Sequence, residues 1–102
     1  MKEISLLMDH IEDELEDACT YVKQAIEFKE SDPEMASLFY RLSTEEMGHM
    51  DMLHKCVVNH IDAYKRTHGE PPAAMSAVYA HLHKRYIEKA EKITGLQNMY
   101  KK

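Results

Sequence analysis

Two short breaks divide the chain into three long stretches of helical periodicity. The first break is Ser31-Asp32-Pro33-Glu34, where Asp32 suits an N-cap and Pro33 suits the first position of a helix. The second is His68-Gly69-Glu70-Pro71-Pro72, where Gly69 can end a helix and the prolines prevent its continuation. These breaks predict one domain over residues 1–102, with helices at about 3–29, 33–65 and 73–93. We expect Gly95 to end the third helix and residues 96–102 to form a loose tail.

The composition supports an all-α fold and argues against a nucleic-acid-binding or membrane-spanning protein. The chain has 102 residues, 44% of them hydrophobic, with only three Gly and three Pro, which favours one small helical domain. A net charge of −5 without a basic face argues against binding to nucleic acid. No apolar run is long enough to cross a membrane, and the first residues lack the pattern of an export signal. Two cysteines without a pairing motif favour a reducing, cytoplasmic location.

The first predicted helix has two adjacent apolar stripes, which form a face wide enough to pack against two neighbouring helices. The stripes are Ile4, Met8, Ile11, Leu15, Val22 and Ile26, and Leu7, Ala18, Tyr21, Ala25 and Phe28. Because the break at residues 30–33 is short, we expect the first two helices to form an antiparallel hairpin.

The second predicted helix carries a carboxylate and an imidazole on a stripe that is otherwise apolar. The stripe is Met35, Leu38, Leu42, Glu46, His49, Leu53 and Cys56. Its spacing predicts that Glu46 and His49 are buried, and burying such groups unpaired costs several kcal/mol. A bound metal ion is the simplest way to satisfy them. Alternatively, the two side chains hydrogen-bond one another or hold a structural zinc. Glu-x-x-His pairs are also common as solvated neighbours on helix surfaces.

Glu14 is expected to complete this cluster from the first helix. It lies 17 residues before Ser31, and Glu46 lies 15 after it. In an antiparallel hairpin the two then differ in height by only about 3 Å, at 1.5 Å per residue. Glu16 is the rival carboxylate, although its side chain points away from both stripes. Tyr21, two turns after Glu14 on the same face, is a candidate to hydrogen-bond a ligand or donate an electron.

Two carboxylates and one imidazole form a mixed oxygen and nitrogen site that suits iron, manganese or zinc. Three ligands leave a metal under-coordinated, and one hairpin cannot close a bundle. Pairing of two chains about a two-fold axis would correct both deficits. The expected homodimer is a four-helix bundle holding Glu14, Glu46 and His49 from each chain, which is the ligand set of a carboxylate-bridged di-iron centre.

The residues quoted so far resemble those of the ferritin-like superfamily. Glu14, Tyr21 and the run Glu45-Glu46-Met47-Gly48-His49 are similar to the first-half signature of ferritins, bacterioferritins and rubrerythrins. Those proteins carry a second half-site, and this chain has no second Glu-x-x-His. It is more similar to the encapsulated ferritins, short proteins whose iron site is completed across a dimer interface.

The resemblance covers roughly residues 11–54 and implies a ferroxidase. Glu14, Glu46 and His49 would bind two irons per dimer interface, with Tyr21 beside them, and Fe(II) would be oxidised by O₂ to support iron storage or detoxification. It also implies assembly into a ring and residence in the lumen of an encapsulin nanocompartment. The segment Ile93-Thr94-Gly95-Leu96-Gln97 is the candidate for shell targeting. The alternatives are a peroxide-scavenging di-iron protein similar to rubrerythrin, and a non-enzymatic helical dimer with a structural metal.

Overall fold

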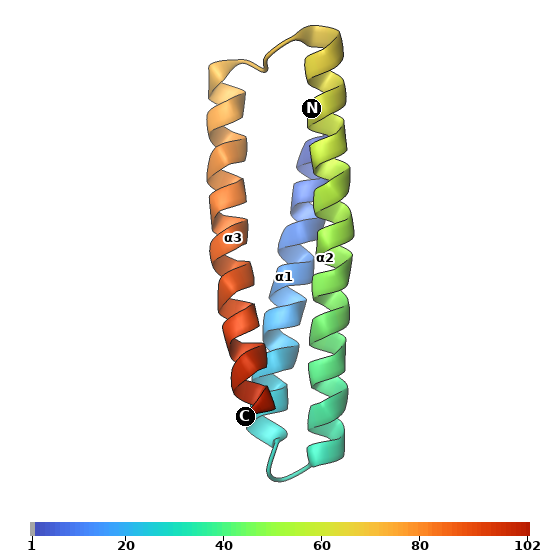
Figure 1. The fold of residues 1–102 in the computed structure, drawn as a ribbon, viewed down its shortest axis with the longest axis vertical. Helices are drawn as coiled ribbons and strands as arrows, with labels where there is room; N and C mark the ends of the chain where they lie inside the picture. The colour runs from blue at the N-terminus through green and yellow to red at the C-terminus, as the bar shows by residue number, and fades with distance from the viewer. Residues whose placement is uncertain (1) are drawn as a thin grey trace.

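The computed structural model describes residues 2–102 and confirms an all-α fold of three helices. They are α1 (Lys2–Phe28), α2 (Pro33–His68) and α3 (Ala73–Lys101). All three lie side by side along one axis, with α1 and α2 antiparallel (Figure 1). The molecule measures 55 × 18 × 18 Å, and its length is that of α2, because 36 residues rise about 54 Å at 1.5 Å each.

Local signals at both breaks act as the sequence predicts. The side chain of Asp32 caps α2 by accepting a hydrogen bond of 3.2 Å from the backbone N–H of Met35. Pro33 occupies the first turn of the helix. Gly69 follows the last helical residue with a φ of 78°, and its N–H donates to the carbonyl of Lys65. The helix therefore ends three residues later than the predicted residue 65.

The contact between α1 and α2 has a seven-residue repeat on both helices, as in coiled-coil seams. Ser43 fixes the register, because its buried hydroxyl donates a hydrogen bond of 2.7 Å to the carbonyl of Ala18. In that antiparallel register, large residues face each other far from the bend and small residues face each other near it. The repeat on α1 is Ile4, Ile11, Ala18 and Ala25, and that on α2 is Val57, Met50, Ser43 and Ala36, all buried.

Helix α3 packs mainly against α1 and runs to Lys101, so the prediction that Gly95 ends it was wrong. The expected loose tail is a helix, held by contacts with the first three turns of α2. Gln97 donates a hydrogen bond of 3.1 Å to the hydroxyl of Ser43, and the ring of Tyr100 stacks on that of Tyr40 with centroids 4.7 Å apart. The candidate targeting segment 93–97 therefore belongs to the packed bundle and is not a free peptide.

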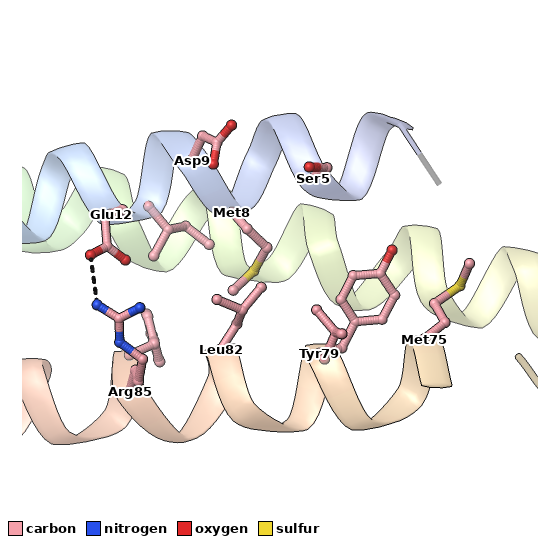
Figure 2. Close-up of a pocket in the computed structure, with 11 residues that line it drawn as sticks. Ser5, Met8, Asp9, Glu12, Met75, Tyr79, Leu82 and Arg85 are labelled. Atoms are coloured by element: carbon pink, nitrogen blue, oxygen red, sulfur yellow. Dashed lines mark hydrogen bonds and ion pairs between the residues drawn. The ribbon is translucent and has the colours of Figure 1, made fainter. Parts of the chain in front are cut away.

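Nearer its start, α3 faces α1 across an open groove of about 440 Å³. Figure 2 shows Met8 of α1 pointing across this groove toward Leu82 of α3. Farther along, Glu12 pairs with Arg85 at 3.5 Å and also accepts a hydrogen bond from Lys89. Apolar packing and one small ionic cluster thus join these two helices at this end.

The stripe of α2 that holds Glu46 and His49 is not the buried face of a single chain, which corrects the prediction. Helix α1 packs instead against the neighbouring row, Ala36, Ser43, Met50 and Val57. Small side chains in that row let the two backbones approach closely. The stripe is left at the edge of the contact, where Leu38 is 52% exposed and Glu46 is only partly buried.

Cys19 and Cys56 are free thiols, and both are half-buried. None of the helices within residues 2–102 combines the length and the apolar character needed to span a bilayer.

Candidate metal centre

Glu14, Glu46 and His49 converge on one point at the edge of the α1–α2 contact. One ligand-type atom from each lies within 4.8 Å of the other two. The convergence follows from the register, because pairing Ala18 with Ser43 sets Glu14 level with the turn between Glu46 and His49. The i, i+3 spacing of the pair on α2 then directs both side chains toward α1. The structure thus brings together the three side chains that the sequence predicts.

The cluster has more negative charge than its own residues can balance. The Nδ1 atom of His49 lies 3.5 Å from Glu14 Oε2 and 4.0 Å from Glu46 Oε2. Both separations are longer than the donor–acceptor distance of a good hydrogen bond, and a single imidazole lies beside two carboxylates. Glu14 Oε2 is buried and has no hydrogen-bond partner among residues 2–102. Because buried polar atoms are nearly always paired, this oxygen marks a place where a cation would fit.

The three side chains are exposed to different degrees. The side chain of Glu46 is 19% exposed, that of Glu14 is 26% exposed and that of His49 is 56% exposed. The expectation that all three are buried was therefore wrong for His49 in one chain. The physical reason is that His49 lies at the edge of the α1–α2 contact, where α1 covers only part of the stripe.

A shallow apolar groove of about 350 Å³ surrounds the open side of the cluster. Its lining consists of Leu7, Glu14, His49, Met52, Leu53 and Cys56. Met52 is 70% exposed, although its surroundings are apolar. The sequence analysis did not identify Met52 as part of the site, and it placed Cys56 on the stripe of the second helix without giving it a role. The available signal was spacing, since Met52 follows His49 by three residues and Cys56 follows it by seven.

The other two candidates from the sequence lie outside the cluster. Glu16 is exposed and supplies no atom to it, so the geometry favours Glu14 as the carboxylate of α1. Tyr21 stacks on Phe39, with ring centroids 6.2 Å apart. Among residues 2–102, no hydrogen bond joins Tyr21 to the three clustered side chains, so its role at the site stays a prediction.

The oxygen and nitrogen donors of Glu14, Glu46 and His49 suit a divalent cation that is hard or of intermediate softness. Two carboxylates and one imidazole match iron, manganese or zinc, whereas copper(I) would require softer sulfur ligands. Three donors leave several coordination positions open on the solvent side, toward the apolar groove. A metal ion held by these three residues would therefore need its remaining ligands from outside this chain or from water.

No protein-family model, curated protein or solved structure matches the chain. The resemblance to the ferritin-like superfamily consequently rests on the residues of the cluster and their spacing.

Proposed function

We propose that the protein is a ferroxidase that oxidises Fe(II) at a two-metal centre formed between two copies of the chain. The observation that carries the proposal is the convergence of Glu14, Glu46 and His49 around a buried carboxylate oxygen without a partner. The same three residues form the ligand unit of carboxylate-bridged di-iron bundles when it is present twice.

Pairing of two copies is supported by the surface around the cluster. The groove beside Glu14 and His49 is lined with apolar side chains, and Leu38 and Met52 are large, apolar and exposed on the same side of α2. A second hairpin packed there would bury this surface and close a four-helix bundle. A two-fold axis would also double the donors to four carboxylates and two imidazoles.

Iron is the substrate in this scheme. Two Fe(II) ions give one electron each to O₂, which takes up two protons and leaves as hydrogen peroxide, while two Fe(III) ions remain. Glu14 and Glu46 supply negative charge that stabilises Fe(III) more than Fe(II), which favours oxidation. His49 adds a nitrogen donor, and the apolar groove would exclude water once it is covered. Tyr21 would support a ligand by hydrogen bonding.

Anaerobic addition of Fe(II) to metal-free protein, followed by admission of air, tests the proposal. Near-ultraviolet absorbance reports Fe(III), and light scattering reports the oligomer. We expect rapid oxidation by the dimer and its loss in Glu46→Gln. The matched control is Glu45→Gln, because Glu45 is exposed on the same turn and pairs with Arg41 at 3.2 Å, outside the cluster.

Three other results would each overturn the proposal. Equal oxidation rates in Glu46→Gln and Glu45→Gln would show that the cluster is not the site. Rapid turnover with hydrogen peroxide but not with O₂ would favour a peroxide-scavenging protein. Tight zinc binding without iron oxidation would favour a structural metal.

Loading into an encapsulin shell and assembly into a ring are further proposals from the resemblance, tested by co-expression with a shell protein.

A further inference from the structure

A group of stacked rings that includes two histidines lies between α2 and α3, away from the Glu14 cluster. His54 follows His49 by five residues, which places it about 140° around the axis of α2. There its ring stacks on His83 of α3, with centroids 5.4 Å apart. Tyr86 completes the group, with its ring 5.2 Å from that of His54 and 5.7 Å from that of His83.

The separation of the two imidazoles suits a shared metal ion. Two histidines bound to one tetrahedral zinc, each at about 2.0–2.1 Å, hold their ring centres about 5 Å apart. The observed 5.4 Å between His54 and His83 is close to that value, so rotation of the rings would bring one nitrogen of each to a common ion.

The surroundings offer room and charge for a cation. A cavity of about 280 Å³ is lined by His54, His83 and Tyr86 together with apolar side chains, and water in it could fill the remaining coordination positions. Asp51 lies one turn before His54 on α2. Residues three apart on a helix lie on the same side, so the carboxylate of Asp51 places a negative charge on the side of α2 that carries His54.

We propose that His54 and His83 bind a divalent cation of the zinc class, which ties the first half of α3 to α2. Imidazole ligands select zinc, nickel or copper(II) over calcium and magnesium, which require oxygen donors. A link is useful at this place, since α3 packs mainly on α1 and has little direct contact with α2. The site belongs to a single chain and does not depend on the proposed ferroxidase centre.

The test uses the full chain carrying Glu14→Gln, Glu46→Gln and His49→Gln, so that the first cluster cannot hold zinc. Zinc chloride is titrated calorimetrically into this parent. We expect one zinc per chain, and binding roughly 100-fold weaker in His83→Gln, because one of two linked ligands is lost. His83 is exposed, so its substitution should not disturb folding. The matched control is His81→Gln, two residues away and exposed on another face of α3.

Hydrogen exchange provides a second readout. Zinc should slow amide exchange across residues 73–86 in the parent and leave it unchanged in His83→Gln. The proposal is overturned if the parent binds no zinc, or if His83→Gln binds it as tightly as His81→Gln. It is also overturned if bound zinc leaves exchange in α3 unaltered. None of these results bears on iron oxidation by the unsubstituted protein, so the two proposals fail separately.

Discussion

At the scale of single residues, Glu14 is expected to lower the stability of the metal-free protein. Its Oε2 atom is buried without a hydrogen-bond partner, and Glu46 brings a second carboxylate to the same point. Replacing Glu14 by Gln removes one of the two charges and adds an N–H that can donate to Glu46. We predict that Glu14→Gln raises the free energy of unfolding of the metal-free protein by about 1 kcal/mol, measured by urea denaturation.

The control for this prediction is Glu16→Gln, because Glu16 is exposed on the same helix and has no place in the cluster. That substitution should leave stability within about 0.5 kcal/mol of the original protein. A clear loss of stability in Glu14→Gln would mean that the carboxylate stabilises the fold without metal. Glu14 and His49 would then form a structural ion pair.

The sequence predicted the three clustered residues but not their exposure. Glu14 could be placed beside Glu46 because the length of each arm of the hairpin is countable from the break at residues 31–34. Counting residues from the break does not show which row of α2 faces α1. That choice depends on the close approach allowed by Ala36 and Ser43, and small side chains give a weak apolar signal. The prediction therefore put His49 in the core, and the structure leaves it 56% exposed.

At the scale of helices, Gly95 lies in the interior of α3 with open space around it. Glycine in a helix interior costs roughly 0.5–1 kcal/mol relative to alanine. We predict that Gly95→Ala stabilises the protein by about that amount in thermal or urea unfolding. Gly69→Ala should do the opposite, because Gly69 has a φ of 78°, which alanine adopts poorly. If α3 ended at Gly95, both substitutions would destabilise the protein.

The ionic cluster between α1 and α3 predicts a pH-dependent link. A hydrogen bond from Lys89, aided by its charge and that of Arg85, lowers the pKa of Glu12 from its ordinary value of 4.5, although burial opposes the shift. A lowered pKa in the folded state means that the stabilisation is complete above pH 4.5 and lost as the pH falls below it.

Glu12→Gln should therefore reduce stability at pH 7 and make little difference at pH 3. The loss is expected to be roughly 0.5 kcal/mol, since the pair is partly exposed to solvent. Urea unfolding at both values measures it, and a Lys89→Met background should make the loss at pH 7 smaller. An equal effect at both values would show that the Glu12 charge is not responsible.

The ends of the helices differ in how far they could be predicted. The boundaries at Asp32 and Gly69 are set by local chemistry, a side-chain cap and a left-handed glycine, and both are readable in sequence. The end of α3 is set by contacts across the bundle, where Gln97 reaches Ser43 and Tyr100 stacks on Tyr40. Local signals at Gly95 pointed to a stop, and these long-range contacts outweighed them.

At the scale of the whole molecule, the cluster of Glu14, Glu46 and His49 lies beside a shallow groove with a mostly apolar lining. The proposed dimer puts the partner over that groove, whereas α3 covers the other side of the hairpin through α1. An exposed residue on each surface therefore separates pairing from folding. Met52 lies in the groove beside His49 and is 70% exposed, and Met99 lies on α3 and is 60% exposed.

We predict that Met52→Lys converts the dimer to a monomer and abolishes rapid iron oxidation, while Met99→Lys changes neither. Both positions are exposed in a single chain, so each substitution should alter its stability by no more than about 0.5 kcal/mol. A lysine in the dimer interface would instead be buried without a partner, and that cost opposes association. Analytical ultracentrifugation and the aerobic iron assay give the two readouts on the same samples. If Met52→Lys became monomeric yet still oxidised iron, three ligands and water would suffice for the reaction. If it stayed dimeric and active, the partner would have to bind elsewhere, and the open side of Glu14, Glu46 and His49 would face solvent in the working protein.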